Sequence, residues 1–277
     1  MNVRMWKHKS TEDNLRKLKS FGYKIIGPVI GDMGCGEYGE GKMSDPSIIL
    51  DEIANFFLNQ KKYKKTKALV TPGPTKEYID PIRFISNKSS GKQGYEIAKS
   101  LSKRGFETTL ITGPTNLNID KEINLIEVET AEEMFKATQE SLPVDIAVFS
   151  AAVADFKINK KNKNKIKKQD KLTLNLEKNI DILNYVSNHN SLRPKLVIGF
   201  AAETNDIQKN AISKLESKNC DWIIANDVSK KDRGFESDYN EVFIYYKNLK
   251  NKKEKLSFKK KSDISEEIVD RIINQIN

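Results

Sequence analysis

The chain has 277 residues, a length that suits one large domain or two smaller ones with a buried core. Hydrophobic residues make up 38% of the chain, which excludes a disordered protein, and no apolar run is long enough to cross a membrane. The formal net charge of +10 suits nucleic acid or a phosphorylated small molecule as a partner, but it does not select between them.

Cysteine and histidine are too scarce to suggest a metal centre. Cys35 and Cys220 lie far apart in the sequence, and His8 and His189 are the only histidines. We therefore expect reduced thiols in a cytoplasm, and neither zinc binding nor histidine-based catalysis. The first six residues also lack the apolar core of a signal peptide.

The first sixty residues have the pattern of helices joined by a glycine-rich loop. We predict a helix at residues 11–21, a short strand at 24–27 and a second helix at 47–59. The glycine-dense stretch 31–43 predicts a loop with unusual backbone angles. Because residues 61–66 are strongly charged, they are the predicted linker between domains at residues 1–60 and 67–277.

After the linker the pattern changes to strands that alternate with helices. Strands are predicted at residues 67–71, 107–112, 124–128, 145–150, 196–201, 222–225 and 240–246. Helices are predicted at 95–104, at 130–141 behind a capping box of Thr130 and Glu133, and at 207–218 and 263–276. This order predicts an α/β, Rossmann-like fold whose mostly parallel sheet has helices on both faces. Ligands then bind at the carboxyl ends of the strands.

A polar segment, residues 80–94, follows the first of these strands and opens a helix. Ser89, Ser90, Gly91 and Lys92 would place N–H groups, hydroxyls and a cation at a helix N-terminus, an arrangement that holds phosphate. The glycine spacing is not that of a Walker A motif. On these residues alone, a phosphate site and a polar turn with a serine cap are equally supported.

The sequence argues against an NAD-dependent dehydrogenase. No Gly-x-Gly-x-x-Gly pattern follows the strand at residues 67–71 directly. The strand at 107–112 ends in Thr112-Gly113-Pro114, without an acidic residue to bind a ribose diol.

Small residues follow the strand at 145–150. The run 151–156 lets a flat ring approach the backbone, and Asp155 could accept hydrogen bonds from ribose hydroxyls. The alternative is a tight turn with a surface aspartate. In the next strand, Phe200 either stacks on a base or packs in the core. Lys214 and Lys218 share one face of the following helix through their i, i+4 spacing.

The lysine-rich run 157–171 is too charged to pack in a core. It suits a solvated loop, or a mobile lid whose lysines close over phosphates. Binding of single-stranded nucleic acid is the third alternative, and it would be favoured by interleaved aromatic residues. Apart from Phe156 at its edge the run has none, so we expect no nucleic-acid partner.

As an ordered set, these segments resemble the ligase half of the bifunctional coenzyme A biosynthesis family, phosphopantothenate–cysteine ligase. The resemblance is carried by residues 71–75, 80–94, 151–155, 165–168, 179–182, 199–204 and 225–228. Upstream, residues 1–6 and 34–43 resemble the substrate motif and the flap of the flavin-dependent phosphopantothenoylcysteine decarboxylase half. Gly34 and Lys42 stand where that half usually has Ala and Arg.

Because the chain begins inside the decarboxylase motif, the resemblance implies a complete ligase half behind a C-terminal remnant of the flavoprotein domain. The family's flavin-binding body and its catalytic histidine would precede residue 1. A truncated gene product and one part of a split enzyme both fit this expectation.

For the ligase half, the resemblance implies CTP-dependent joining of 4′-phosphopantothenate to cysteine through an acyl-cytidylate, with Mg²⁺ bridging the phosphates. Lys165 would neutralise the triphosphate in the first step, and Asn87 would hold the acyl-cytidylate in the second. The implied nucleotide site comprises Phe149, Ser150 and Ala151 at the base and Asp155 at the ribose. It also comprises Ile180, Asp181, Ile182, Leu183, Phe200, Lys214 and Lys218, with Ser89, Ser90, Gly91 and Lys92 facing phosphate.

For the decarboxylase half, the resemblance implies that Cys35 donates a proton, that Asn2 binds the substrate carboxylate and that FMN is the cofactor of the full-length domain. We expect the remnant to be inactive alone. The alternative is full bifunctional activity, continuing to 4′-phosphopantetheine, once the missing part is supplied. The family further implies a cytoplasmic homodimer that pairs through the ligase domain and has no membrane partner.

Overall fold

The computed structural model describes residues 1–58, 63, 65–168, 170–229, 237–247 and 253–276. The chain divides into two compact units, Met1–Gln60 (unit 1) and Lys61–Asn277 (unit 2). That residues 1–60 and 67–277 act as separate domains remains a prediction.

Unit 1 is small and has little interior. Helices α1 (Val3–Trp6) and α2 (Lys9–Ser20) precede a hairpin of β1 (Val29–Asp32) and β2 (Tyr38–Lys42), and α3 (Pro46–Leu58) follows. Among the residues of unit 1 whose burial the structure describes, only Gly41 and Ser44 are buried. This described part of unit 1 therefore contains no buried apolar side chain.

Two predictions in unit 1 are wrong. Residues 24–27 are not a strand, because Gly27 adopts a φ of +79° and Pro28 has no N–H to donate to a neighbouring strand. The glycine-dense stretch is not only a loop, since β1 and β2 pair across it from Val29 to Asp32. Glycine density signals unusual backbone angles, but it does not exclude strand pairing beside them.

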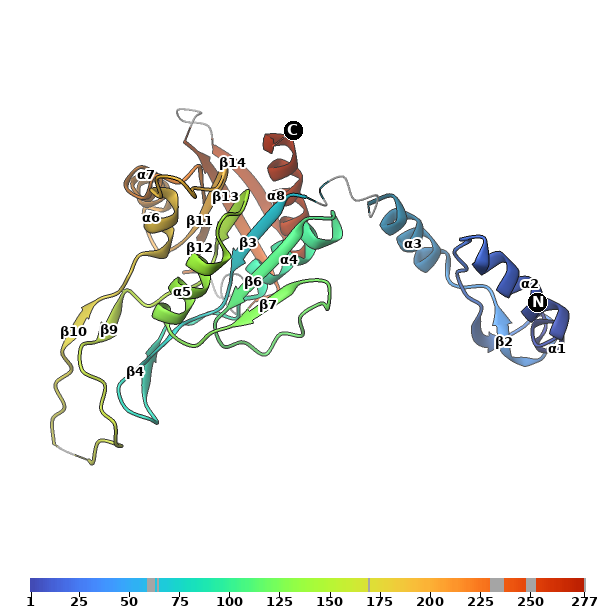
Figure 1. Ribbon diagram of the computed structural model, residues 1–277, viewed down its shortest axis with the longest axis horizontal. Coiled ribbons are helices and arrows are strands. Elements are labelled where there is room, and N and C mark those ends of the chain that lie inside the picture. Colours follow the sequence, from blue (N-terminus) through green and yellow to red (C-terminus); the bar gives the residue numbers. More distant parts are fainter. Residues whose placement is uncertain (59–62, 64, 169, 230–236, 248–252, 277) are drawn as a thin grey trace. The chain divides into compact units, whose positions relative to one another are not determined.

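Unit 2 is built on one main sheet with the strand order β14-β13-β12-β11-β8-β3-β6-β7 (Figure 1). The parallel strands are β3 (Lys67–Thr71), β6 (Glu107–Thr112), β7 (Asn124–Glu127), β8 (Ile146–Phe149), β11 (Leu196–Glu203) and β12 (Trp222–Asp227). The strands β13 (Tyr239–Tyr246) and β14 (Lys253–Lys260) extend the sheet in antiparallel fashion. The predicted α/β fold with a mostly parallel sheet is confirmed.

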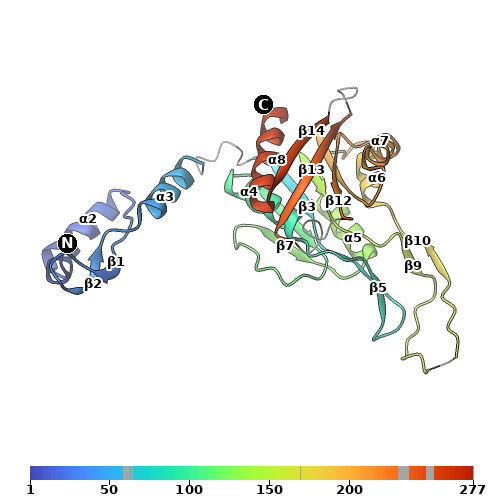
Figure 2. The ribbon, with the colours of Figure 1, turned by 180° about the vertical axis from the view of Figure 1, so that it is seen from behind.

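Helices cover both faces of this sheet. On one face lie α4 (Lys92–Lys103) and α8 (Lys261–Ile276), and on the other lie α5 (Ala131–Ser141), α6 (Ile182–Ser187) and α7 (Ile207–Lys218). Figure 2 shows α8 next to α4 and to the antiparallel strands.

Alternating side chains of the strands belong to two apolar clusters, one on each face of the sheet. In β3, Val70 packs with Ile97 of α4 on one face, whereas Leu69 packs with Met134 of α5 on the other. Successive strand residues point to opposite faces, so a strand buried on both sides is apolar throughout. This is why the continuous apolar run of β3 predicts a central strand.

The strand order reverses between β3 and β8. From β3 the chain adds strands outward on one side, β6 and β7, and then returns to β8 and adds β11 and β12 on the other. Connections that leave to opposite sides open a crevice at the carboxyl ends of the two central strands. Across it, the backbone N–H and the hydroxyl of Ser150 both donate to the carbonyl oxygen of Thr71, each at 3.0 Å.

Two hairpins that the sequence does not predict extend from this edge. They pair β4 (Lys76–Tyr78) with β5 (Phe84–Ser86), and β9 (Phe156–Ile158) with β10 (Leu176–Lys178) (Figure 1). The lysine-rich run forms most of the connection between β9 and β10, residues 159–175, which we call the arm. The run is therefore neither wholly a loop nor part of the core.

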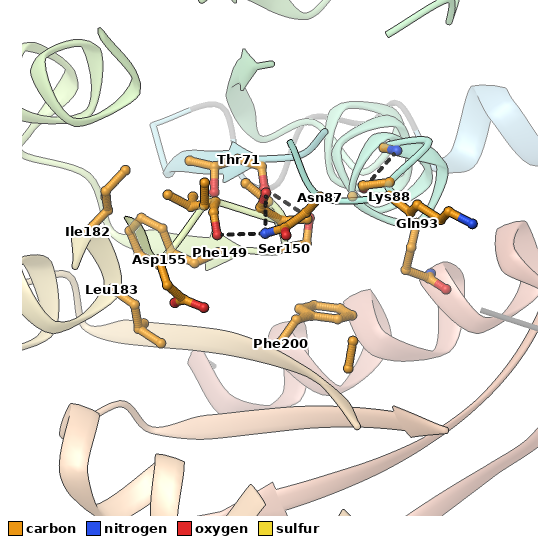
Figure 3. Close-up of a pocket in the computed structure, with 18 of the residues that line it drawn as sticks. Thr71, Asn87, Lys88, Gln93, Phe149, Ser150, Asp155, Ile182, Leu183 and Phe200 are labelled. Atoms are coloured by element: carbon orange, nitrogen blue, oxygen red, sulfur yellow. Dashed lines mark hydrogen bonds between the residues drawn. The ribbon is translucent and has the colours of Figure 1, made fainter. Parts of the chain in front are cut away.

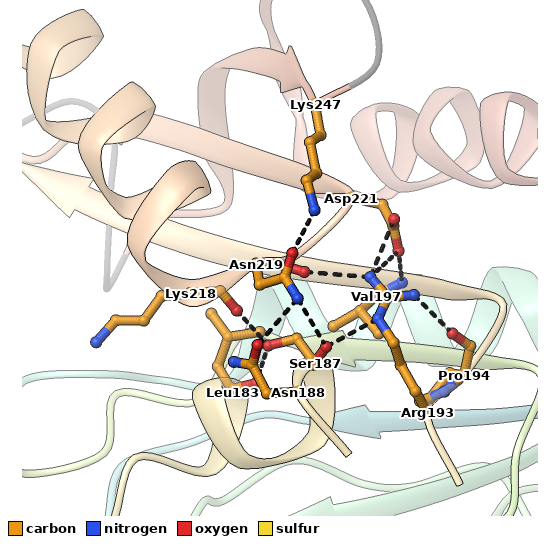
Figure 4. A network of polar contacts seen from close by, with 10 residues as sticks. All are labelled: Leu183, Ser187, Asn188, Arg193, Pro194, Val197, Lys218, Asn219, Asp221 and Lys247. Atoms are coloured by element: carbon orange, nitrogen blue, oxygen red, sulfur yellow. Dashed lines mark hydrogen bonds and ion pairs between the residues drawn. The ribbon is translucent and has the colours of Figure 1, made fainter. Parts of the chain in front are cut away.

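A polar network at the amino end of β12 joins α6 to α7 (Figure 4). The hydroxyl of Ser187, in α6, lies within hydrogen-bond distance of the carbonyl oxygen of Lys218, the last residue of α7. Arg193 donates to the Ser187 carbonyl at 2.8 Å and to both carboxylate oxygens of Asp221 at 3.1 Å. The network fixes the ends of two helices that also face the crevice.

Candidate functional site

A pocket of about 800 Å³ lies in the crevice beyond the carboxyl ends of β3, β8 and β11 (Figure 3). Its walls come from segments that are distant in the sequence. They are residues 87–94, 149–156 and 178–183, with Thr71, Phe200, Ala202, Lys214, Lys218, Asn226, Asn240 and Lys261. A pocket of this size holds a ligand as large as a nucleotide.

Nearly all of the site residues predicted in unit 2 line this one pocket. They are Asn87, Ser89, Ser90, Gly91, Lys92, Phe149, Ser150, Ala151, Asp155, Ile180, Asp181, Ile182, Leu183, Phe200, Lys214 and Lys218. Lys165 is the exception, because it lies exposed on the arm and is not among the lining residues. What each of these residues binds stays a prediction.

The first turn of α4 opens into the pocket. Gly91, the N-cap residue, precedes it with a φ of 72° and has no side chain with which to cap the helix. N–H groups at an uncapped helix N-terminus attract anions. Gly94 lets the helix approach the sheet closely, since a Cβ there would lie 2.1 Å from the Ser150 hydroxyl. The Gly91 N–H also donates to Ser89 Oγ at 3.4 Å, so the phosphate site and the serine-capped turn both stay predictions.

Asn87 lies between α4 and the loop that follows β8. Its Nδ2 donates to the carbonyl oxygens of Ala152 and Val153, at 3.3 and 3.0 Å. The side chain is otherwise exposed at the pocket wall (Figure 3). Asn87 thus shapes the strand-end loop and also faces the place where a ligand would lie.

The loop that carries Asp155 is held from two sides. The Ala154 N–H donates to Thr75 Oγ1 at 3.0 Å, and Asn179 Nδ2 donates to the Ala154 carbonyl at 3.1 Å. The Asp155 carbonyl accepts the Asn179 N–H at 2.8 Å. The backbone is therefore fixed while the carboxylate of Asp155 points into the pocket (Figure 3).

Two lysines of α7 supply positive charge to the same wall. Lys214 Nζ donates to the Phe200 carbonyl at 2.7 Å, and burial lowers the pKa of this ammonium group. Lys218 forms an ion pair with Asp181, which also caps α6 by accepting the Asn184 N–H at 2.8 Å. An anion in the pocket would thus meet Lys214 as well as the Lys218–Asp181 pair.

Several lining residues were not predicted: Lys88, Gln93, Gly94, Lys178, Asn179, Asn226, Asn240 and Lys261. Asn179 and Asn226 lie within segments that carry the family resemblance, so a signal for them was present in the sequence. Lys261 had none, because a lysine at the start of an amphipathic helix has the pattern of a surface residue.

The predicted decarboxylase residues lie in unit 1. Cys35 is an exposed free thiol in the turn between β1 and β2. Asn2 caps α1 by accepting the Met5 N–H at 2.9 Å. Because the described residues of unit 1 bury no apolar side chain, they do not by themselves fit the enclosure that a flavin ring needs.

Metal-ligand clusters and membrane spans were searched among the described residues. No group of three or more His, Cys, Asp or Glu side chains there is placed to hold a metal ion. No helix in the described ranges combines the length and apolar character needed to cross a membrane.

The sheet order and the pocket at the reversal point define the class of the molecule, a doubly wound α/β protein with a ligand pocket at its topological switch point. Two family models then identify the family of the chain. The chain belongs to the family described as the DNA/pantothenate metabolism flavoprotein C-terminal domain, whose model matches residues 63–276. A second model, described as flavoprotein, matches residues 1–58.

Curated relatives are similar to most of this chain. The coenzyme A biosynthesis bifunctional protein CoaBC of Haemophilus influenzae is 40% identical over 277 residues, covering 99% of this chain and 68% of that protein. CoaBC of Escherichia coli K12 is 40% identical over 251 residues, covering 89% of this chain and 62% of the relative. The chain thus matches about two thirds of the length of these relatives.

Solved structures have the same fold. The crystal structure of the C-terminal domain of CoaBC has a TM-score of 0.66 and 32% identity, covering 78% of this chain and 98% of that one. The DNA/pantothenate metabolism flavoprotein of Streptococcus pneumoniae has a TM-score of 0.63 and 25% identity, covering 76% and 99%. A Cab2 mutant in complex with phosphopantothenate-cysteine, 18% identical with a TM-score of 0.61 over 84% of this chain and 94% of that one, shows the fold alone.

These matches correct one expectation. The description of the chain as a complete ligase half behind a decarboxylase remnant is wrong as stated. The chain is the C-terminal domain of the family at residues 63–276 together with a flavoprotein segment at residues 1–58, so the ligase half is not the complete chain.

Proposed function

We propose that the chain catalyses the CTP-dependent ligation of 4′-phosphopantothenate and cysteine, an amide-forming step of coenzyme A biosynthesis. One observation carries the proposal: residues predicted from separate segments for a nucleotide site meet in a single pocket at the switch point. The membership of the chain in a pantothenate-metabolism family supports the choice of substrates.

The chemistry explains why such a pocket is needed. A free carboxylate resists attack by an amine because it is anionic and has no leaving group. Attack of the carboxylate oxygen on the α-phosphate of CTP would form an acyl-cytidylate and release pyrophosphate. The cysteine amine would then add to the acyl carbon, and CMP would leave as the amide forms.

Both steps bring anions together, so cations and N–H donors supply most of the stabilisation. The pocket offers the N-terminus of α4 with Lys92 at one place, and Lys214 and Lys218 at another. The backbone at residues 149–151 would contact the cytosine, and Asp155 would bind the ribose. The choice of CTP over ATP follows from the family.

Asn87 is proposed to stabilise the acyl-cytidylate during the second step. Its amide already lies against the carbonyl oxygens of the loop after β8, in the middle of the pocket wall. A ligand oxygen that replaced one of those carbonyl oxygens would accept a hydrogen bond from the same N–H group. One N–H donor that faces charge developing in the transition state contributes about 100-fold to the rate when water is excluded.

Lys165 is proposed to assist the first step although it lies outside the pocket of its own chain. The arm would have to close over that pocket or reach the pocket of a second copy. We propose a homodimer formed through unit 2, because the hairpins beside the arm expose apolar side chains, among them Ile82, Phe84, Phe156 and Leu176. Light scattering tests the dimer directly.

Mg²⁺ is proposed to bind through the phosphate oxygens of CTP, as the family resemblance implies. When bound, the ion supplies neutralisation of the triphosphate charge. The substrates are proposed to meet the enzyme in the cytoplasm, where the exposed Cys35 thiol would stay reduced.

Residues 1–60 are proposed to be inactive in decarboxylation by themselves. Cys35 and Asn2 would serve only with FMN and the flavin-binding part of the family, and the product would then be 4′-phosphopantetheine. Release of CO₂ from phosphopantothenoylcysteine by this chain alone would contradict the proposal.

The most informative assay is pyrophosphate release from CTP. It should require 4′-phosphopantothenate but not cysteine, and the later addition of cysteine should release CMP and form the amide. The assay separates a ligase from a dehydrogenase and from a basic nucleic-acid-binding module. Salt-dependent DNA binding without turnover of CTP would contradict the proposal.

A further inference from the structure

Arg193, in the loop between α6 and β11, contacts the ends of both helices that form one wall of the pocket. Its guanidinium group donates to the carbonyl oxygen of Ser187, the last residue of α6, at 2.8 Å, and to that of Asn219, which follows α7, at 3.1 Å. It also binds both carboxylate oxygens of Asp221, each at 3.1 Å (Figure 4). The end of a helix leaves carbonyl groups without partners in the helix, and the fork of guanidinium N–H groups serves two such ends at once.

Lys218, the last residue of α7, contacts both ends of α6. Its carbonyl oxygen accepts a hydrogen bond from the Ser187 hydroxyl at the end of that helix, and its ammonium group pairs with Asp181 at the start. Asp181 is the N-cap residue of α6 and accepts the Asn184 N–H at 2.8 Å. The place of α6 against α7 therefore depends on two contacts of Lys218, and the guanidinium group of Arg193 reinforces the one at Ser187.

Helix α6 depends on these contacts because it is short. It has six residues, and a helix of that length does not persist without tertiary contacts. Ile182 and Leu183 of α6 belong to the same apolar cluster as Leu215 of α7. Ile182 and Leu183 also line the pocket, so a shift of α6 against α7 would move this wall relative to Lys214.

The wall formed by α6 belongs to one end of the pocket. Asp155, Ile182 and Leu183 lie at that end, whereas Gln93 of α4 lies at the other, with Asn87 between them (Figure 3). The proposed function puts the ribose at Asp155 and phosphate at the first turn of α4. Displacement of α6 would therefore weaken the contacts with the nucleoside and leave those with the outer phosphates unchanged.

We propose that Arg193 is a positioning residue for nucleotide binding. It would touch no ligand, because it is not among the residues that line the pocket. By tying the ends of α6 and α7 to Asp221 at the start of β12, it keeps Ile182 and Leu183 where the nucleoside of CTP requires them. A wall that is already in place needs no ordering when the ligand binds, so the contact raises the affinity through preorganisation. The inference rests on the proposed function and adds a residue to it.

Binding of separate nucleotide parts tests the inference. Calorimetry on the full chain would compare CTP, CMP and pyrophosphate as ligands of the wild type and of Arg193→Met. We expect Arg193→Met to lose about 10-fold in affinity for CTP and for CMP, the effect of one lost charged hydrogen bond, and to bind pyrophosphate as the wild type does. At saturating CTP its turnover rate should stay within about threefold of the wild type, so that the loss appears in the KM for CTP.

Arg193→Lys keeps a cation at the site and replaces Arg193→Met should that variant fail to fold. One ammonium group cannot reproduce the fork that binds both helix ends and Asp221. We therefore expect a smaller loss of the same kind, about threefold for CTP and CMP and none for pyrophosphate.

Arg104→Met is the matched control, because Arg104 also joins two helices outside the pocket lining. It follows α4 and pairs with Asp270 of α8, on the face of the sheet opposite α6 and α7, and its side chain is 20% exposed against 28% for Arg193. This variant should bind all three ligands as the wild type does. An equal loss of CMP affinity in Arg104→Met, or an equal loss for CMP and pyrophosphate in Arg193→Met, would show general destabilisation and overturn the inference. So would unchanged binding of CMP in Arg193→Met.

The two proposals fail separately. A wild-type chain that releases no pyrophosphate from CTP with 4′-phosphopantothenate contradicts the proposed function, whatever Arg193 does. A wild-type chain that does so while Arg193→Met binds CMP equally well contradicts only the role of Arg193.

Discussion

The guanidinium group of Arg83 binds the carboxylate of Asp80 through two hydrogen bonds, at 3.0 and 2.7 Å, and also donates to the carbonyl of Ile166 at 2.6 Å. The Ile166 N–H in turn donates to Asp80 at 3.1 Å. The side chain of Asp80 is fully buried. The pair therefore anchors the arm at the residue that directly follows Lys165.

Loss of this anchor should loosen the arm. In Asp80→Asn, an uncharged amide replaces a carboxylate that accepts hydrogen bonds from the backbone and from Arg83. We expect trypsin to cleave at the arm lysines about tenfold faster, the effect of making a local opening easier by one charged hydrogen bond. Limited proteolysis with mass spectrometry measures this, and pyrophosphate release should slow in parallel.

Asp170→Asn is the control, because that carboxylate is exposed on the arm. Cleavage in Asp80→Asn at the rate of this control would show that the Asp80–Arg83 pair does not hold the arm.

The same carboxylate predicts how the arm responds to acid. Desolvation raises the pKa of Asp80. The N–H groups of Ile82, Arg83 and Ile166 and the Arg83 guanidinium together lower it by more, so the pKa lies well below its ordinary value. A pKa lowered by folding stabilises the fold fully above the ordinary aspartate pKa of about 4, and that stabilisation is lost as the pH falls below it. Hydrogen exchange at the Ile166 amide should stay protected from pH 7 to about 5 and lose protection below about 4. Protection that persists in Asp80→Asn would separate this amide from the charge of Asp80.

Periodicity predicts the central elements of unit 2 well. The strand at residues 67–71 and the helix at 207–218 are confirmed at the predicted residues, as Lys67–Thr71 and Ile207–Lys218. Both have a local signal, an apolar run or an amphipathic repeat. The helix predicted at 95–104 begins earlier, at Lys92, because its first turn faces the pocket and carries no apolar residue.

The missed elements have no such signal. β14 is rich in lysine, since an edge strand keeps charge on its exposed side. The strands of the two hairpins are three residues long, and each is defined by its partner across a loop. Helix α6 has six residues, too few for a repeat to be recognised. These elements depend on contacts that a sequence window does not contain.

The pocket residues also fall into two groups, those with a local sequence signal and those without one. Residues that directly follow strands, such as Ala151 and Asp155, are predictable because parallel strands end at one edge. Lys261 and Asn240 come from distant elements that tertiary packing brings to the pocket. Lys165 is the reverse case, since its motif matches the family while the described structure leaves it outside the pocket.

Asn87→Asp should separate the two half-reactions. A carboxylate at this position cannot donate to the intermediate, and it would lie against the carbonyl oxygens of Ala152 and Val153. We expect pyrophosphate release in a single turnover to stay within about threefold of the wild type and amide formation to fall by about 100-fold or more, as when one oxyanion donor is removed. Quenched-flow separation of the acyl-cytidylate measures both. Asn87→Ala removes the donor without adding charge, and equal loss of both steps in that variant would contradict the assigned role.

Lys165→Gln should suppress the first half-reaction instead. The cation is expected at the triphosphate, so pyrophosphate release should fall by about 100-fold, while amide formation from chemically prepared acyl-cytidylate should remain. Lys163→Gln is the matched control, because Lys163 is also exposed on the arm. Similar losses in both variants would show that the arm contributes general positive charge and that Lys165 has no specific contact.

If the arm of one copy places Lys165 at the pocket of the other copy in a dimer, two inactive variants should restore each other's activity. An equimolar mixture of Lys165→Gln and Asn87→Asp chains, allowed to exchange subunits, would then contain one pocket with both wild-type groups. Activity above that of either variant would support action across the dimer. Activity no greater than the average of the two would place the arm over the pocket of its own chain.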